Sequence, residues 1–381
     1  MIILTDIIRK LFSIYCALVT MFLTTAPGEA VDVDHSRDNT NYPYVFVHGY
    51  FGWGDYNEAS EKYAYWGMST TNQTETFNKS GYTAAAADVD PVGSAWDRAC
   101  ELYAQLTGTV VDYGKAHSEK YGHPRYGEDY TGRPLVNKWD KVNKINIVSH
   151  SFGGPTCALF ASVLEYGADE EIKATTDGSL SDFFKGGKGD SIYSITGIAG
   201  AFNGTTMCIV AEKVDTFFNG GKVEGDNGLY DMNPDNAAKL NESIKAVPNI
   251  YYFTVPCCST VEICGRYFSD ITKTDLQFGL PSMIMCNMNT VTDGGIVIDE
   301  AWQPNDGMVN TISEIGPFNS TFNYVEAAVS VELAQSGFDT GVYNVFETYT
   351  GSHMSIMGNM TIPNPEGKDY LLNIMQMVNA L

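Results

Sequence analysis

The chain has few basic residues: 23 lysines and arginines stand against 46 aspartates and glutamates, for a formal net charge of −23 at pH 7. A surface of this sign repels nucleic acid and anionic membranes, so we expect neither as a partner. Neutral substrates fit this negative surface better. With 381 residues and 44% hydrophobic composition, the chain is typical of a folded protein with a large core.

The chain also lacks an apolar run that would comfortably span a membrane. The run over residues 11–26 follows two basic residues and precedes small ones, with a cut expected near Ala30. This order is typical of a secretory signal peptide, and an uncleaved anchor is the alternative. We therefore expect a signal peptide (1–30), a polar tail (31–41) and one large exported domain (42–381), with no integral membrane span after cleavage.

No C-x-x-C pair occurs among the eight cysteines, which argues against a cysteine-based metal site. Removal of Cys16 with the signal peptide leaves an odd number. In an exported protein we expect one or two local disulfide bonds among the crowded cysteines, which are Cys257, Cys258, Cys264 and Cys286. Glycosylation is expected if the source is eukaryotic, at the sequons of Asn72, Asn78, Asn203, Asn241, Asn319 and Asn359.

Segments with strand and helix patterns alternate along the chain, and no internal repeat is present. Helical spacing of apolar residues extends from Trp96 through Val110 to His117. Strands are expected at the start of "YPYVFVHGYFGWG" (42–54), at 145–148, 191–198 and 250–255 and around 296–299, and a closing helix near 370–380. This alternation predicts a single α/β domain with a mostly parallel central sheet and helices on both faces.

The stretch "INIVSHSFGG" (145–154) reads as strand, sharp turn and helix, with Ser151 at the turn. Such a nucleophile elbow needs small residues two positions before and after its serine. Gly153 fills the second position, but Ser149 stands where glycine is usual. The local pattern therefore leaves two interpretations open: Ser151 as a nucleophile, or as an ordinary hydroxyl at a strand end.

A nucleophilic serine needs a histidine base, and the chain has only six histidines. In the chain order of a hydrolase elbow the base follows the serine, and His353 is the single histidine after Ser151. The acidic residue that orients the histidine must lie between Ser151 and His353 in the sequence. Asp306, in "EAWQPNDGMVNT", is the preferred candidate, and Asp299 is its rival.

Ester or amide chemistry at a serine also needs backbone N–H groups that stabilise an oxyanion. One usually comes from the residue after the serine, here Phe152, and the other from a loop after an early strand. "VHGYFGWG" fits this loop, with Tyr50 after the His-Gly pair. Its pairing with the elbow favours the catalytic interpretation of Ser151.

These residues resemble the thermostable secreted lipases of Gram-positive bacteria, of the Geobacillus and Staphylococcus type. The resemblance is carried by "VHGYFGWG", "YWG" (65–67), "WDRACELYAQLTGTVVDYGKAHSEKYGHPRYG" (96–127), "HSFGG", "YDM" followed by "AAKLN", and "NDGMVNT". It implies an α/β-hydrolase fold and ester hydrolysis on triacylglycerols. It also implies a triad of Ser151, Asp306 and His353 and oxyanion donors at Tyr50 and Phe152. The family already has alanine at the position of Ser149.

The same family binds zinc through two aspartates and two histidines, and Asp97, His117 and His123 match three of these ligands. Histidines six residues apart need a bend between them, which Gly122 can provide. The fourth ligand lies in an insertion of the family that is shortened here; Asp215, Asp226 or water are the choices. Calcium is not expected, because neither Ser355 nor Met360 offers the acidic oxygen that the family has there.

The sequence therefore predicts a secreted serine ester hydrolase of the lipase type that meets neutral lipid at a lipid–water interface. A carboxylesterase for short, soluble esters is the alternative within enzymes, because the lid region of the family is shortened near 207–229. A binding protein without catalysis on the same fold is the alternative from another class.

Overall fold

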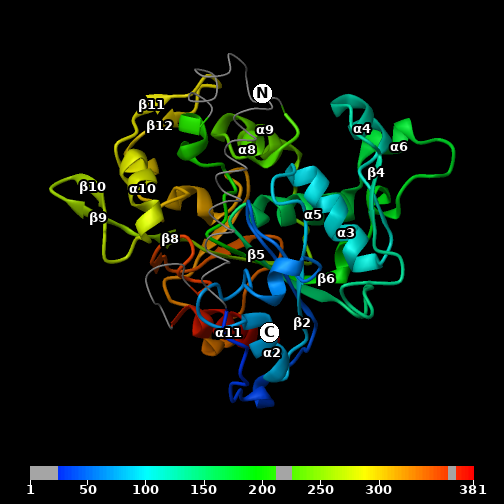
Figure 1. Cartoon of the computed structure of the whole chain (residues 1–381), viewed down its shortest axis with the longest axis horizontal. Coiled ribbons are helices and arrows are strands. Elements are labelled where there is room, and N and C mark those ends of the chain that lie inside the picture. Colours follow the sequence, from blue (N-terminus) through cyan, green and yellow to red (C-terminus); the bar gives the residue numbers. More distant parts are fainter. Residues whose placement is uncertain (1–24, 212–224, 359–365) are drawn as a thin grey trace.

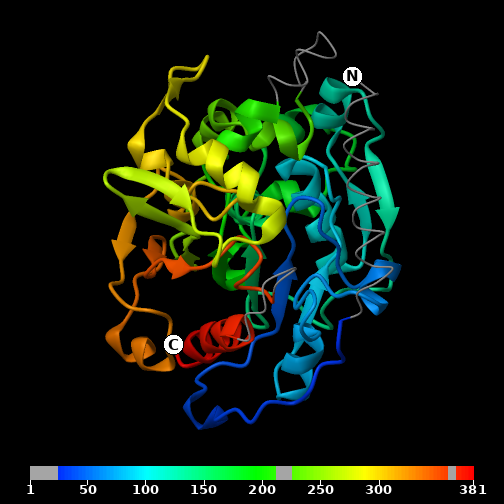
Figure 2. The same cartoon turned by 60° about the vertical axis from the view of Figure 1, so that its left-hand side comes forward.

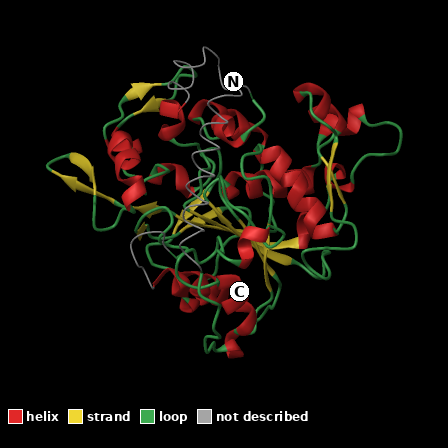
Figure 3. Ribbon diagram, viewed as in Figure 1, coloured by secondary structure: helices red, strands yellow, loops and turns green. Residues whose placement is uncertain are grey.

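A parallel β-sheet forms the centre of the computed structural model (Figure 3). It has seven strands in the order β13-β14-β7-β6-β5-β1-β2. Every pairing in this sheet is parallel. The strands are β1 (Tyr44–Val47), β2 (Ala84–Ala87), β5 (Ile145–His150), β6 (Ile192–Ile198), β7 (Tyr251–Val255), β13 (Phe322–Tyr324) and β14 (Tyr343–Val345). The structure describes residues 25–211, 225–358 and 366–381. Residues 1–24 of the predicted signal peptide, Asp215 and Met360 lie outside them.

Helices cover both faces of this sheet (Figure 1). α3 (Ala95–Thr107) and α5 (Gly153–Tyr166) pack on one face, and α2 (Gln73–Lys79) and α11 (Glu366–Asn379) on the other. The alternating side chains of β1 divide between the two cores, since Val45 and Val47 join the α3–α5 core and Phe46 joins the α2–α11 core. Among the described helices, none has the length and apolarity needed to cross a membrane. The predicted α/β architecture is confirmed.

Shorter helices and strand pairs surround this centre. The helices are α4 (Lys115–Tyr121), α6 (Asp169–Ala174), α8 (Gly228–Asp231), α9 (Pro234–Ser243) and α10 (Gly279–Cys286). The strand pairs are β3 (Val110–Asp112) with β4 (Tyr126–Asp129), β8 (Cys257–Cys258) with β15 (Tyr349–Thr350), β9 (Thr260–Ile263) with β10 (Arg266–Ser269), and β11 (Thr290–Val291) with β12 (Val297–Ile298). Figure 2 shows the β9–β10 hairpin, α10 and the β11–β12 pair gathered on one side of the molecule.

Two of the predicted elements differ in the structure. The helical spacing predicted around Val110 is wrong, because Gly108 ends α3 in the left-handed conformation and Val110 then begins β3, which pairs with β4. Residues 296–299 do contain a strand, β12, but it pairs with β11 and not with the central sheet.

The expected disulfide bonds are not formed: all seven cysteines of the described residues are free. The four crowded ones lie in different surroundings. Cys257 is buried, the Cys258 thiol contacts Thr260, Cys264 is exposed in the β9–β10 turn, and Cys286 contacts Asn305. Two of the sequons are also inaccessible in the folded chain, because Asn203 and Asn241 are buried and hydrogen-bonded to each other.

Candidate functional site

Ser151 lies in the sharp turn between β5 and α5, with a left-handed backbone φ of 57°. The turn is crowded against β1. A Cβ added at Gly153 would lie 2.5 Å from the Val47 carbonyl oxygen, and one added at Gly49 would lie 2.6 Å from the Ser151 Cβ. A left-handed conformation is unfavourable for serine, so the surrounding contacts must hold it in place. Ser149 is accommodated because its buried hydroxyl donates to the Thr196 carbonyl of β6 at 3.2 Å.

The structure brings the serine, the histidine and the preferred acid together. The Ser151 hydroxyl lies 2.8 Å from His353 Nε2, and His353 Nδ1 lies 2.5 Å from Asp306 Oδ2. The backbone N–H of His353 also donates to the Asp306 carbonyl at 2.9 Å. Asp306 is fully buried and His353 is nearly so. This arrangement can move a proton from the hydroxyl to the imidazole while the carboxylate holds the ring.

Asp306 is held in position by its own turn. Its Oδ1 accepts from the backbone N–H groups of Met308 and Val309, at 2.9 and 2.8 Å. The rival acid, Asp299, is exposed and caps a short helical turn through the Ala301 N–H. Of the two candidates, only Asp306 hydrogen-bonds His353.

Both predicted oxyanion residues lie at the elbow. Phe152 follows Ser151 directly at the N-terminus of α5, where the helix dipole favours negative charge. The rings of Tyr50 and Phe152 are in edge contact, with centroids 6.4 Å apart. Gly228 packs against both rings, since a Cβ there would lie within 2.9 Å of each. The loop after β1 and the turn after β5 therefore approach each other at Ser151.

A hydrogen-bond chain that no sequence pattern indicated links this loop to His353. The Tyr65 hydroxyl accepts from the Gly49 N–H at 2.9 Å and lies 2.7 Å from His150 Nδ1. His150 Nε2 lies 2.9 Å from the His353 carbonyl. Burial and the nearby His353 hold the pKa of His150 well below its ordinary value, so the ring is neutral. The Tyr65 hydroxyl then donates to His150 Nδ1, and the His150 Nε2–H donates to the backbone carbonyl of His353.

Arg98 of α3 clamps the same loop from inside the core. Its guanidinium donates to the backbone carbonyls of His48 and Gly49 and lies over the Phe152 ring, 5.1 Å from its centroid. Burial lowers the pKa of Arg98 to about 10, so the group remains charged at neutral pH. "WDRAC" contains this arginine, but nothing in the local pattern indicated that it faces inward.

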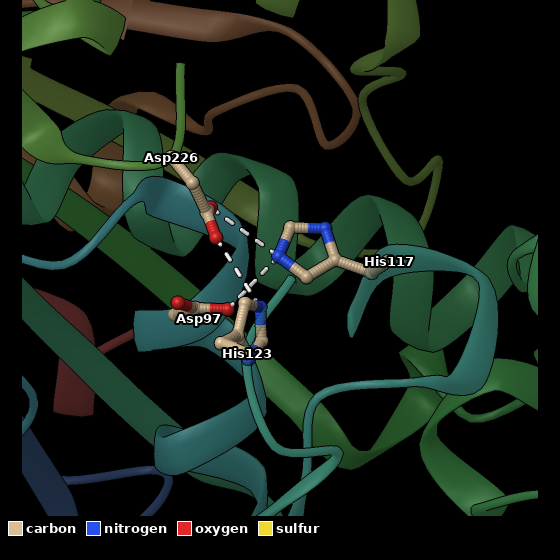
Figure 4. Close-up of side chains that lie close together, drawn as sticks. All are labelled: Asp97, His117, His123 and Asp226. Atoms are coloured by element: carbon tan, nitrogen blue, oxygen red, sulfur yellow. Dashed lines mark ion pairs between the residues drawn. The ribbon is translucent and has the colours of Figure 1, made fainter. Parts of the chain in front are cut away.

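A second cluster lies apart from the serine and gathers Asp97, His117, His123 and Asp226 (Figure 4). Asp97 stands in the first turn of α3, whose N-cap Ser94 accepts from its N–H. His117 lies on α4, which ends at Gly122 in the left-handed conformation and so returns the chain at His123. Asp226, one of the choices for the fourth ligand, completes the set.

The donor set of this cluster fits a metal ion. All four ligand atoms lie within 4.8 Å of one another, and His117 Nε2 is 3.1 Å from Asp97 Oδ1 and 3.2 Å from Asp226 Oδ1. Asp97 Oδ1 and both histidine Nε2 atoms are buried, and none of their contacts with the described residues has the geometry of a hydrogen bond. His123 Nδ1 lies 2.9 Å from the Pro124 carbonyl, which leaves Nε2 as a ligand atom. Burial opposes protonation of His117, but the Asp226 and Asp97 carboxylates raise its pKa to about 9.

Ser355 and Met360 are the two positions at which acidic calcium ligands were considered. Ser355 is buried, and its hydroxyl donates to the Ser352 carbonyl at 2.8 Å. Met360, the second position, lies outside the described residues.

Comparison with known proteins shows that the chain is similar to lipases. Residues 40–216 and 221–360 match the family model "Lipase-like, C-terminal domain". The chain is 30% identical to a lipase of Staphylococcus hyicus over 401 residues, which cover 93% of this chain and 59% of that one. It superposes on EstA from Clostridium botulinum with a TM-score of 0.78 and 28% identity, covering 90% and 88% of the two chains. For lipase 1 from Pelosinus fermentans the TM-score is 0.71, with 32% identity and coverage of 88% and 98%.

The chain spans about half of the length of the curated relatives it matches, from 46% to 59% for the first three. The solved structures are covered more completely, at 88% and 98% for the two named above. The likeness therefore concerns the part of the relatives that carries the α/β fold.

We predict that Tyr65→Phe destabilises the fold. The Tyr65 hydroxyl serves a buried N–H and a buried imidazole, and its loss leaves both without this partner, at a cost of about 1–3 kcal/mol. Chemical denaturation measures the change. Tyr82→Phe is the matched control, because the buried Tyr82 hydroxyl has no hydrogen-bond partner among the described residues. Equal effects of the two substitutions would contradict the linking role of Tyr65.

Proposed function

This chain belongs to the staphylococcal-type lipase family of the α/β-hydrolase fold, and we propose that it is a secreted serine hydrolase that cleaves acylglycerol esters. The observation that carries the proposal is the continuous relay from the Ser151 hydroxyl through His353 to the buried Asp306 carboxylate. Such a relay activates a hydroxyl that is otherwise a weak nucleophile.

In the proposed mechanism, Ser151 Oγ attacks the ester carbonyl carbon while His353 Nε2 accepts its proton. Asp306 keeps Nδ1–H directed toward itself and stabilises the imidazolium that forms. The N–H groups of Tyr50 and Phe152 stabilise the tetrahedral oxyanion. The imidazolium then protonates the departing alkoxide oxygen. The alcohol is released and the acyl group remains bound to Ser151 as an acyl-enzyme. His353 then deprotonates a water molecule that attacks the acyl carbonyl carbon. The bond to Ser151 Oγ breaks, the imidazolium returns its proton to that oxygen, and the fatty acid is released.

Two alternatives differ from this proposal in measurable ways. A carboxylesterase would prefer short, dissolved esters, whereas a lipase hydrolyses long-chain acylglycerols. A binding protein without catalysis would not react with a fluorophosphonate, which modifies only an activated serine. A serine hydroxyl that merely ends a strand needs no such partners, so the contact of His353 with Ser151 and of Asp306 with His353 favours the catalyst.

We predict that Ser151→Ala and His353→Ala each lower kcat on a soluble ester by about 1,000-fold or more, and Asp306→Asn by somewhat less, because the three act as a unit. Fluorophosphonate labelling of the wild type and loss of the label in Ser151→Ala provide a second measurement. Asp299→Asn is the control for the acid. Near-normal activity of Asp306→Asn, with a large loss in Asp299→Asn, would refute this assignment.

The partner that we propose is a neutral lipid–water interface, and an exposed apolar surface beside the active site supports it. Ile271 is 86% exposed, and Leu280 and Met283, one turn apart on α10, are 69% and 56% exposed. The sequence from Leu276 to Thr292 contains no charged residue, although the whole chain carries −23. Phe278, just before α10, has its ring centroid 6.4 Å from that of His353. Such surfaces mark contacts with other apolar phases.

We predict that a Leu280→Ser, Met283→Ser double variant loses several-fold activity on emulsified triacylglycerol and keeps its kcat/KM on a dissolved short-chain ester. Removal of apolar side chains weakens adsorption and leaves the relay untouched. The control is Val142→Ser, because Val142 is 72% exposed just before β5, at the opposite end of that strand from Ser151. Equal losses on both substrates would argue against adsorption through this surface.

We further propose that the Asp97–His117–His123–Asp226 cluster holds a structural zinc ion. Two imidazoles and two carboxylates are a donor set that zinc accepts in tetrahedral sites. The ion would tie α3 and α4 to the segment before α8 and would neutralise the repulsion between the two aspartates.

We predict that purified protein contains about one zinc ion per chain and that chelation lowers its melting temperature, because binding to the folded state alone stabilises that state. Asp226→Asn should reduce the metal content. His35→Gln is the control, since His35 pairs with Asp38 outside the cluster. Far less than one zinc ion per chain, without a thermal response to added zinc, would rule the site out.

A further inference from the structure

The residue directly before His353 is a buried serine that is tied to a distant part of the chain. The Ser352 hydroxyl donates to Asp275 Oδ2 at 2.5 Å, a distance typical of a hydroxyl that donates to a carboxylate. Asp275 is fully buried, lies 77 positions earlier in the sequence and stands just before the helical turn Leu276–Phe278. The loop of His353 is therefore anchored at the position next to the base.

The turn that follows Asp275 also contacts the loop of Asp306. A Cβ added at Gly307 would lie 2.7 Å from the Phe278 Cβ, so Phe278 packs closely against the residue after Asp306. The Phe278 ring stands edge-on to the His353 ring, at an interplanar angle of 85°. The Phe278 N–H donates to the Asp275 carbonyl at 2.8 Å and holds the turn together. This one turn thus meets the loops of both the histidine and the acid.

The residue before Asp275 fixes the position of the carboxylate relative to the Asp306 loop. Thr274 is buried, and its hydroxyl donates to the Ser259 carbonyl at 3.1 Å. The Ser259 N–H in turn donates to the carbonyl of Asn305, the residue before Asp306, at 2.9 Å. The acceptor of the Ser352 hydroxyl is therefore itself held in place, and a fixed acceptor orders the group that donates to it.

We propose that Asp275 is a positioning residue for His353 and that it acts through the Ser352 hydroxyl. Two hydrogen bonds on successive residues then hold the base: Ser352 Oγ donates to Asp275, and the His353 N–H donates to the Asp306 carbonyl. Together they fix the backbone from which the imidazole projects, so that Nε2 stays 2.8 Å from the Ser151 hydroxyl. The inference rests on the proposed ester hydrolysis for its effect on rate.

A buried carboxylate is an unfavourable way to fill space, because desolvation of such a group is costly and apolar side chains of similar volume would pack at lower cost. What the carboxylate adds is direction. A hydrogen bond fixes the orientation of the Ser352 hydroxyl, whereas apolar packing leaves a small side chain free to shift. Proton transfer between Ser151 and His353 tolerates only small displacements, so an anchor with direction is useful next to the base.

The test measures steady-state kinetics of Ser352 and Asp275 variants on a soluble ester. Ser352→Ala and Asp275→Leu each remove one partner of the hydrogen bond. We expect kcat to fall about tenfold and KM to stay within about twofold, because displaced reacting groups slow the chemical step. The double variant should lose no more than either single one, since both act through one contact. Asp275→Asn keeps an oxygen that accepts from Ser352, so its kcat should be close to that of the wild type.

Ser162→Ala is the matched control. The Ser162 hydroxyl is also buried and accepts from the Lys245 N–H at 3.1 Å, but it lies in the half of α5 away from Ser151. This variant should melt at a lower temperature and keep its kcat. Three results would each overturn the proposal: an unchanged kcat in Ser352→Ala, losses that add in the double variant, or a loss in Asp275→Asn as large as in Asp275→Leu.

A proton NMR measurement decides the question without substrate, even if Asp275→Leu does not fold. The His353 Nδ1–H, in its short hydrogen bond with Asp306, should give a resolved low-field signal in the wild type. Ser352→Ala should shift or broaden this signal, whereas Ser162→Ala should leave it unchanged. An identical signal in Ser352→Ala would refute the positioning role. A wild type without esterase activity would refute the proposed function, while the comparison of signals still decides the role of Asp275.

Discussion

The close approach of two backbone turns, one after β1 and one after β5, is the constraint on which the site depends. Gly49 and Gly153 have no room for a side chain, and Ser151 is held with positive φ between them. The strain of that conformation is offset by what surrounds it: the Arg98 clamp on the first loop and the packed start of α5. Because parallel strands bring their carboxyl ends to one edge, the loops that carry Asp306 and His353 reach the same point.

A continuous set of buried hydrogen bonds extends this constraint beyond the three reacting residues. Gly49, Tyr65 and His150 connect the loop after β1 to the backbone of His353. On the far side, the Asp306 carboxylate accepts from the backbone N–H groups of Met308 and Val309. Such networks are expensive to bury when incomplete and specify one arrangement when complete. Buried hydrogen bonds on both sides thus hold the residues between which the proton moves.

The sequence predicted the parts of the site that follow from chain order and turn chemistry. Ser151 and His353 could be found because a strand–turn–helix pattern precedes the single downstream histidine. Arg98 and Tyr65 could not be found in this way, because each hydrogen-bonds residues that are distant in sequence. Each also lies in a segment whose residue spacing indicates only an ordinary helix or turn. The same limit explains the incorrect disulfide prediction. Neighbouring cysteines in sequence say nothing of whether their Cβ atoms face each other, and Cys257 and Cys264 occupy a core and a hairpin tip.

The described residues that flank positions 212–224 on either side are hydrogen-bonded to segments near the site. On one side, the Thr206 N–H donates to the Asn310 side chain and the Thr205 hydroxyl to the Met308 carbonyl, in the loop of Asp306. On the other, Asp226 joins the histidine cluster, and the Gly228 N–H donates to the Val92 carbonyl. The entropy of closing a loop grows only slowly with its length. Evolution can therefore lengthen or trim the chain between these anchored residues without moving Ser151, His353 and Asp306.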